Sequence, residues 1–344
     1  MADVARAAGH SLSTVDRVLN GRSAVRADTA VQIHDAAQAL GYRAAGVLRE
    51  RLRGLAPALT LGFLMPGPEA PFYRALGEAL AQAVADRSDL RARALFEPLR
   101  GMAPDAVAEQ LLALAGRVDA LALVAADHPV LHEAVAQVAA RGVPVFTLLS
   151  DLDTPAVAGH VGLDNRRVGR TAAWFVTRLA RRPGPLAVFI GTHRFQCQEL
   201  CEMSFRAWVR EQAPQFELLE TRVTLESDDH AEEAMRDLLA RHDDLAGFYV
   251  GGGGIEGCLR ALAGTEGLGV VGVTHELNAT TRRALLRGPL VAVLSEPMPA
   301  LAAELVALMR RACVESAAVA TDPGDAPPPR RVLLPFTITV PDSA

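Results

Sequence analysis

The chain has 344 residues, of which 50% are hydrophobic and 22% are charged, and its formal net charge at pH 7 is -5. This length and apolar content allow more than one hydrophobic core and predict two or three domains. No apolar run reaches the length of a membrane span and no signal peptide precedes the first predicted helix, so we expect a cytoplasmic protein with no membrane partner. The four cysteines are too few and too scattered to form a disulfide framework.

The net charge is divided unevenly along the chain. Residues 1–55 hold eight arginines and five acids, whereas acids outnumber arginines in the remainder. Only the N-terminal segment therefore suits a polyanion such as DNA.

The first forty residues predict a helix-turn-helix unit. Apolar residues recur at helical spacing over residues 4–8 and again over residues 15–19, with Gly9 and Ser11 between the two runs. Gly9 supplies the backbone freedom of a tight turn, and Ser11 is a good N-cap for the second helix. A third helix, over residues 29–40, would cover the small apolar faces of the first two.

The run from Ala8 to Gly21, followed by Val25-Arg26, Thr29 and Leu40-Gly41-Tyr42, resembles the DNA-binding headpiece of the LacI (lactose-repressor) family of bacterial transcription regulators. The resemblance implies a sequence-specific regulator, a repressor rather than an enzyme, that acts as a homodimer on pseudo-palindromic operator DNA. It also implies that the second helix enters the major groove. Base edges would be contacted by Leu12, Ser13 and Arg17, and phosphates by Thr14, Asn20, Arg26 and Thr29.

Other readings of single headpiece residues stay open. Thr14 and Asn20 would also serve as local caps, and Arg17 as a solvated surface charge. Asp16 stands where the family usually has Ser, and a carboxylate close to the phosphate backbone should weaken DNA binding by repulsion.

After a headpiece of residues 1–43, residues 44–56 predict an amphipathic linker. In the resembled family this linker forms a hinge helix on operator DNA, and a Leu wedges into the minor groove. Leu52 is the candidate here. An ordinary linker without that function is the alternative.

From residue 59 onward, apolar strand patterns alternate with helix patterns, which predicts doubly wound α/β sheets. Helices are expected in each gap, beginning with 72–87, 103–117 and 129–141. The expected strands are 59–65, 90–96, 119–125, 143–149, 185–191, 216–224, 245–251, 268–273, 290–296 and a last one, VLLPFTI, over 332–338.

Two α/β lobes in series resemble a type I periplasmic-binding-protein fold, which follows the headpiece in the LacI family. The resemblance implies an effector domain over residues 57–340, in which the chain crosses between lobes three times. One lobe would hold about 57–161 and 292–322, and the other about 162–291 and 323–340. The Pro-rich segment 322–330 would be the final crossing.

An effector would bind between the lobes, where the loops at the carboxyl ends of the strands converge. The polar and aromatic side chains of these loops are the candidates, although acids and histidines at strand ends are also ordinary helix caps. The expected effector-binding residues are Phe72, Tyr73, Asp127, Asp164, His193, Cys201, Thr274 and Glu276.

Three polar groups that grip hydroxyls in sugar-responsive members of the family are replaced here. Cys201 occupies the usual Arg position, residues 251–254 are four glycines in place of Asn-Asp, and Thr274 replaces an Asp. Neutral side chains cannot match the charge-assisted bonds of Arg and Asp. The effector is therefore not a simple sugar held in the standard way, or it is held from other loops. The four glycines could also cradle a phosphate or carboxylate on their amides.

His193, Cys197 and Cys201 are spaced by four residues and would share a face if all three lay on one helix, which would suit a soft metal or an oxidant sensor. His193 is expected before that helix and cysteines are often buried as small apolar residues, so we predict neither a metal site nor a cofactor. The sequence has no nucleophile elbow and no dinucleotide fingerprint, which argues against an enzyme. A ligand-binding module without DNA activity is the remaining alternative.

Overall fold

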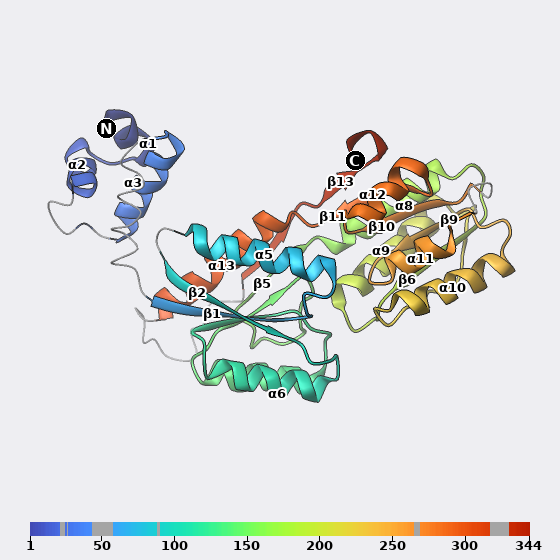
Figure 1. Ribbon diagram of the computed structural model, residues 1–344, viewed down its shortest axis with the longest axis horizontal. Helices are drawn as coiled ribbons and strands as arrows, with labels where there is room; N and C mark the ends of the chain where they lie inside the picture. Colours follow the sequence, from blue (N-terminus) through green and yellow to red (C-terminus); the bar gives the residue numbers. More distant parts are fainter. Residues whose placement is uncertain (21–24, 26, 43–57, 88–89, 265–268, 317–329) are drawn as a thin grey trace.

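The computed structural model describes residues 1–20, 25, 27–42, 58–87, 90–264, 269–316 and 330–344. Within these residues the chain forms a three-helix headpiece followed by two α/β lobes, each built on its own sheet (Figure 1). The predicted fold class is thereby confirmed. The predicted linker over 44–56 with Leu52, and also Arg26, lie outside the described residues.

The headpiece contains α1 (Ala2–Ala8), α2 (Leu12–Asn20) and α3 (Ala27–Ala39). Gly9 ends α1 in the left-handed region with φ 68°, which an L side chain rarely adopts. The Ser11 hydroxyl accepts a hydrogen bond from the Thr14 amide at 3.2 Å, as predicted for an N-cap. All three helices contribute to one small core, whose buried members are Val4, Ala5, Val15, Val18, Leu19, Ala30, Ile33 and Ala37.

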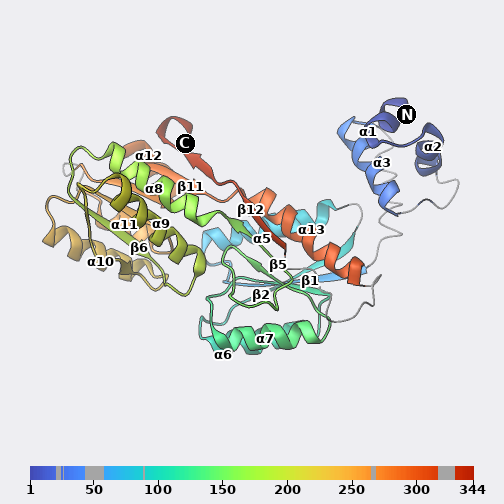
Figure 2. The ribbon, with the colours of Figure 1, turned by 180° about the vertical axis from the view of Figure 1, so that it is seen from behind.

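The first lobe has a wholly parallel sheet in the order β12-β5-β4-β3-β1-β2. Alternate residues of a strand point to opposite faces, so Phe63 packs with residues of α5 and α13 while Leu64 packs with residues of α6 and α7. The first pair of helices thus covers one face of the sheet and the second pair the other (Figures 1 and 2). The strands are β1 (Ala58–Met65), β2 (Arg91–Pro98), β3 (Ala120–Leu123), β4 (Val145–Leu148), β5 (Gly159–Leu163) and β12 (Arg330–Leu334), and the helices are α5 (Pro71–Asp86), α6 (Pro104–Ala115), α7 (Pro129–Ala140) and α13 (Met298–Ser316).

The second lobe repeats this three-layer plan with the order β13-β11-β10-β9-β6-β7, and β8 also pairs with β6. Its strands are parallel except β13, which runs antiparallel to β11. Val188 faces the layer of α8 and α9, whereas Phe189 faces the layer of α10, α11 and α12. The strands are β6 (Pro185–Ile190), β7 (Glu217–Leu218), β8 (Arg222–Val223), β9 (Gly247–Val250), β10 (Val271–His275), β11 (Leu290–Ser295) and β13 (Thr337–Thr339). The helices are α8 (Asn165–Leu179), α9 (Gln196–Gln212), α10 (Asp228–Arg241), α11 (Ile255–Ala261), α12 (Ala279–Arg287) and the short 3-10 turn η3 (Pro341–Ser343).

The strand pairing places two crossings between the lobes differently from the expected boundaries. β11 belongs wholly to the second sheet, so the second crossing follows Ser295 and not residue 292. The expected last strand, 332–338, is divided: β12 pairs with β5 in the first sheet, and β13 pairs with β11 in the second. The third crossing is therefore at Pro335-Phe336, and not at 322–330. Proline ends β12 because it has no amide hydrogen for a sheet ladder.

Two further strand predictions differ from the structure. β5 was not expected, because its sequence GHVGL carries two glycines, which are poor strand formers. The expected strand 216–224 is two short pairings, β7 and β8, both with β6. Within the described part of the chain, no helix combines the length and the apolar character that crossing a bilayer requires.

Candidate functional site

The exposed side of α2 carries the residues expected at base edges. Leu12, Ser13 and Arg17 are all exposed, whereas Val15 and Val18 hold the opposite side of the helix in the headpiece core. The Arg17 guanidinium donates from Nε to the Ser13 carbonyl at 3.2 Å, which keeps the side chain along its own helix. Thr14 is half-buried and pairs with the Ser11 hydroxyl at 2.8 Å, and Thr29 is half-buried at the start of α3. The side chains of Leu12, Ser13 and Arg17 therefore point outward from α2, whereas Thr14 is part of the N-cap of this helix.

A cavity of about 100 Å³ lies between the lobes, where the carboxyl ends of both sheets face each other. Its lobe-one wall is aromatic and apolar, from Phe72 and Tyr73 at the start of α5 to Leu149 after β4. Its lobe-two wall carries Gln198 on α9 and the glycine loop after β9. This is the position expected for a ligand in sheets of this kind.

Four of the eight expected effector-binding residues line the cavity, namely Phe72, Tyr73, Cys201 and Glu276. The ring centroids of Phe72 and Tyr73 are 5.1 Å apart in an edge-to-face arrangement. Burial raises the pKa of the Tyr73 hydroxyl well above its ordinary value, so this group is neutral at physiological pH.

The other four expected residues lie outside this cavity lining and have partners of their own or are buried. Asp164 caps α8 by accepting from the Arg167 amide at 3.2 Å. Asp127 lies 2.5 Å from His132 Nε2, in a separate pocket beside the cavity. His193 lies 2.9 Å from Glu202, and Thr274 is fully buried within β10. Asp164 is therefore a helix cap, which is one of the two roles that the sequence left open for it.

The glycine loop after β9 cradles a carboxylate, but it is the chain's own Glu226. The Gly253 amide donates to Glu226 Oε2 at 3.1 Å, and Gln198 Nε2 donates to Glu226 Oε1 at 2.7 Å. Gln198 is fixed in turn because its Oε1 accepts from the Gly191 amide at 2.8 Å. A Cβ added to Gly253 would lie 2.3 Å from Glu226 Oε2, so only glycine permits this approach.

Two more acids in the cavity follow strands of the second lobe. Glu276 comes after β10 and adopts φ 60°, and Glu296 comes after β11. Burial raises the pKa of Glu276 to about 8, with a further contribution from the neighbouring Glu296 charge. Burial also raises the pKa of Glu296 to about 7 and that of Glu226 above its ordinary value.

The effector-binding residues expected from the sequence do not include Glu226, Glu296, Gln198 and His275, which also line the cavity. A sequence signal existed for Glu296, because it is the last residue of the predicted strand 290–296, and His275 lies beside Glu276. Gln198 had no such signal, since its role depends on the contact between α9 and the loops after β6 and β8.

Residues 61–315 match the family described as Periplasmic binding protein domain, and residues 1–44 match the family described as Bacterial regulatory proteins, lacI family. The chain belongs to the periplasmic binding protein domain family, and its headpiece is a lacI-family domain. The exposed face of α2 thus belongs to a lacI-family domain, and the cavity lies within the periplasmic binding protein domain.

Curated relatives of the chain are named as regulators. The HTH-type transcriptional regulator MalR of Streptomyces coelicolor is 30% identical over 197 residues, which cover 57% of this chain and 54% of that protein. The HTH-type transcriptional regulator reg1 of Streptomyces lividans shows the same identity and coverage. The matching part of the chain spans about half the length of these relatives.

Solved structures share the fold of the periplasmic binding protein domain. A solute binding protein of an ABC transporter from Agrobacterium vitis, bound with alpha-D-tagatopyranose, superposes with a TM-score of 0.71 at 16% identity, covering 82% of this chain and 95% of that one. GanP, a glucose-galactose binding protein from Geobacillus stearothermophilus, gives a TM-score of 0.71 at 16% identity, covering 83% and 98%. At 16% identity, the similarity to these two structures shows that the chain shares their fold.

Proposed function

We propose that the chain is a sequence-specific transcription repressor of the cytoplasm, whose α2 reads operator DNA and whose inter-lobe cavity binds a small polar effector. The observation that supports this most directly is the combination in one chain of an exposed α2 face, bearing Leu12, Ser13 and Arg17, with a cavity between two lobes. The names of its curated relatives agree with this function.

The two lobes touch beside the cavity, which gives an effector a means of control. The Asp127 amide of the first lobe donates to the Arg194 carbonyl of the second at 2.7 Å, and the Cys197 amide lies 3.5 Å from the Ser150 hydroxyl. A ligand that contacts both lobes binds the closed arrangement more tightly than an open one and so shifts the population toward it. In a homodimer on a pseudo-palindromic operator, this shift would change the spacing of the two headpieces.

A metal or thiol sensor has less support than an effector-controlled repressor. The described residues contain no group of three His, Cys, Asp or Glu side chains placed to hold a metal ion. His193 precedes α9, as expected from the sequence, and its Nε2 lies 2.9 Å from Glu202 Oε2. Burial raises the pKa of the Cys197 thiol to about 12 and also raises that of Cys201, which disfavours the reactive thiolate.

The proposal is tested by selecting bound fragments from a genomic DNA library with the full chain and comparing wild type with Arg17→Ala. We expect wild type to retain fragments that share a two-fold symmetric sequence. Arg17→Ala should lose about 1–3 kcal/mol of binding to the selected sequence, because a base-edge contact is removed. The variant Arg6→Ala removes the same charge from α1 and should weaken selected and unrelated DNA alike. A chain that binds a small molecule but retains no fragment would instead be a binding module without DNA activity.

A further inference from the structure

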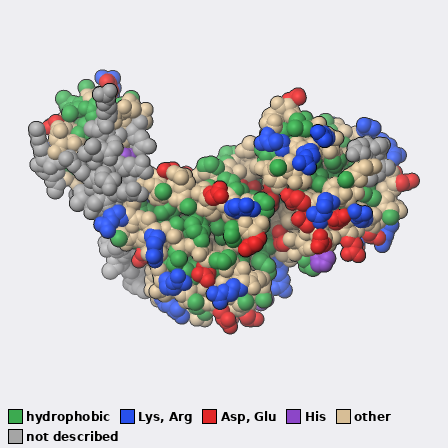
Figure 3. Space-filling model, in the orientation of Figure 1, with side chains coloured by type: hydrophobic (Ala, Val, Ile, Leu, Met, Phe, Trp, Pro, Cys, Tyr) green, Lys and Arg blue, Asp and Glu red, His purple; other side chains and the backbone are tan. Residues whose placement is uncertain are grey.

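The charge inside the inter-lobe cavity has one sign. Glu226, Glu276 and Glu296 all line it, and no arginine is among the described lining residues; the chain has no lysine at all. On the outer face of the second lobe, by contrast, arginines lie among the acids, as Figure 3 shows. The exclusion of basic side chains is thus a feature of the cavity and not of the lobe.

Nothing in the described cavity neutralises these carboxylates. Glu226 accepts only from neutral donors, the Gln198 amide and the Gly253 backbone. The Oε2 atom of Glu296 is fully enclosed and has no hydrogen-bond partner among the described residues, while its Oε1 lies 4.0 Å from His275 Nδ1. Burying a carboxylate oxygen without a hydrogen-bond donor costs free energy. A donor that reached Glu296 Oε2 would therefore be stabilised there.

His275 is the one nearby group that could carry a positive charge, and it is neutral. Its Nε2 lies 2.7 Å from the Tyr249 hydroxyl, within the second-lobe core. Burial lowers the pKa of His275 to about 4, so the ring is uncharged at neutral pH. The cavity therefore offers carboxyl groups without any cationic partner.

We propose that the effector is a small organic cation, whose ammonium group faces Glu276 and Glu296 and whose carbon skeleton packs against Phe72 and Tyr73. The inference rests on the proposed function, because it takes this cavity to be the effector site. An anionic ligand would find no cationic partner among the described lining residues and would be repelled by each carboxyl that ionises, and the Gly253 amide that could have held a phosphate is already occupied by Glu226.

The lobe-one wall and the lack of a metal cluster favour an organic cation over an inorganic one. An ammonium within reach of an aromatic face gains a cation–π attraction in addition to its ion pair. The described residues hold no three-ligand group suited to a metal ion. A sugar-type ligand would also lack the Arg grip, because Cys201 occupies that position in the cavity.

Binding of a cation should depend on pH in a defined direction. The raised pKa values of Glu276 and Glu296, to about 8 and about 7, mean that both carboxyls are partly protonated near neutral pH. A cation prefers the ionised form, so it expels protons and binds more tightly as pH rises from about 6 to about 8. The charged and titratable groups that face these two carboxyls from the packed elements are Tyr73, Cys197, Cys201, Glu226, Asp228, Tyr249, Glu256 and His275.

The test uses matched pairs of probes that differ in charge, added to the full chain without DNA: glucosamine with glucose, and putrescine with 1,4-butanediol. We expect at least one amine at about 10 mM to raise Tm while its neutral counterpart does not. The Kd of putrescine, which stays a cation over this range, should fall severalfold between about pH 6 and about pH 8. Glu276→Gln and Glu296→Gln should each weaken its binding at least about tenfold. Glu233→Gln, an exposed acid on α10, removes the same charge outside the cavity and should leave binding unchanged.

Several results would overturn the inference. The inference is wrong if a neutral probe raises Tm as much as its amine. It is also wrong if neither amine raises the Tm of wild type, and both results are read from wild type alone. An amine response that Glu276→Gln and Glu296→Gln both retain would place the amine elsewhere. DNA selection with the same preparation separates these failures from failure of the proposed function, because a repressor with a neutral effector would still retain operator fragments.

Discussion

At the scale of single residues, the contact between Asp16 and Asn20 on α2 bears on the DNA binding proposed for the headpiece. Asn20 Nδ2 donates to Asp16 Oδ1 at 2.6 Å, so a side chain expected at a phosphate is engaged by a carboxylate one turn away on α2. That carboxylate also repels the phosphate backbone.

Asp16→Ser should therefore strengthen DNA binding, because it removes the repelling charge and releases the Asn20 amide. We expect Kd for selected and unrelated DNA to fall by about threefold to tenfold at low salt, since the gain is largely electrostatic. Fluorescence anisotropy at two salt concentrations measures it. Asp3→Ser removes an acid of α1 that pairs with Arg6 and serves as the control. Equal affinities of wild type and Asp16→Ser would contradict the prediction.

The raised pKa of Glu276 links stability to pH. The folded chain keeps a proton on Glu276 up to about pH 8, whereas the unfolded chain releases it near the ordinary carboxyl pKa of 4.5. The folded state then binds more protons in this window, so the free energy of unfolding falls as pH rises from about 5 to about 8.

Glu276→Gln removes this dependence and should be more stable than wild type at about pH 8, by about 1–3 kcal/mol. Urea unfolding at a series of pH values gives the measurement. The exposed variant Glu233→Gln should follow the wild-type curve. If Glu276→Gln loses stability with pH as steeply as wild type does, another group carries the linkage.

The candidate site was only partly predictable from the sequence. The rule that ligands contact loops at strand ends selected Phe72, Tyr73 and Glu276 correctly for the cavity lining. It could not distinguish Glu276 from Asp164, because both follow strands; only the backbone geometry shows that Asp164 is occupied as a helix cap. The bond between Gln198 and Glu226 joins residues from different elements, and no local pattern predicts it.

At the scale of elements, the packing of α8 on α9 positions the wall of the cavity that contains Cys201. Gly169 on α8 faces α9 so closely that an added Cβ would lie 2.1 Å from the Cys201 carbonyl oxygen and 2.2 Å from the Ser204 hydroxyl. The two helices approach because no side chain intervenes at this position.

Gly169→Ala should destabilise the protein by about 2 kcal/mol or more, because the overpacking outweighs the better helix propensity of alanine. Chemical unfolding followed by circular dichroism tests this. Gly116→Ala at the end of α6 is the matched control, since an added Cβ there meets no atom nearer than 3.8 Å, and its stability should equal or exceed wild type. Similar unfolding midpoints for the two variants would show that α8 and α9 can separate without cost.

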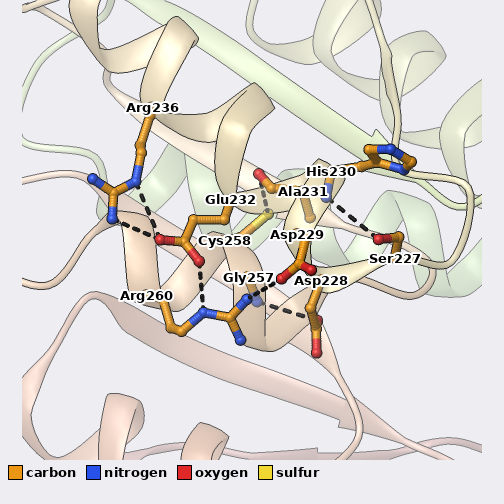
Figure 4. A network of polar contacts seen from close by, with 10 residues as sticks. All are labelled: Ser227, Asp228, Asp229, His230, Ala231, Glu232, Arg236, Gly257, Cys258 and Arg260. Atoms are coloured by element: carbon orange, nitrogen blue, oxygen red, sulfur yellow. Dashed lines mark hydrogen bonds and ion pairs between the residues drawn. The ribbon is translucent and has the colours of Figure 1, made fainter.

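Surface contacts between elements were beyond sequence analysis altogether. Arg260 of α11 donates from Nε to Glu232 of α10 at 2.6 Å, and Arg236 donates from Nη2 to the same carboxylate at 2.6 Å (Figure 4). The Arg236 pair is a helical i, i+4 spacing that a sequence displays, but the Arg260 contact requires α11 to lie beside α10. The sequence did not predict β5 because its glycines, too, depend on neighbours that are distant in the chain. An added Cβ at Gly159 would lie 2.8 Å from the Arg330 carbonyl oxygen of β12.

At the scale of the whole molecule, three crossings between the lobes constrain their movement. The first lies between β5 and α8, the second between β11 and α13, and the third at Pro335-Phe336. Three adjacent connections permit bending of one lobe against the other and oppose their separation. A ligand between the lobes can thus change an angle while both sheets stay intact.

The proposed regulator is expected to bind DNA as a two-fold symmetric assembly. α2 has only nine residues and presents few side chains to base edges, so one headpiece can read only a short sequence. Two headpieces joined through a homodimer add their contacts, and the second binds as an intramolecular event. Replacing one half of a selected symmetric operator with unrelated sequence should therefore weaken binding by at least about a hundredfold. Anisotropy titrations with whole and half operators, together with sedimentation of the full chain in solution, provide the measurement. If the half operator binds as tightly as the whole one, a single headpiece supplies the affinity and the dimeric arrangement is wrong.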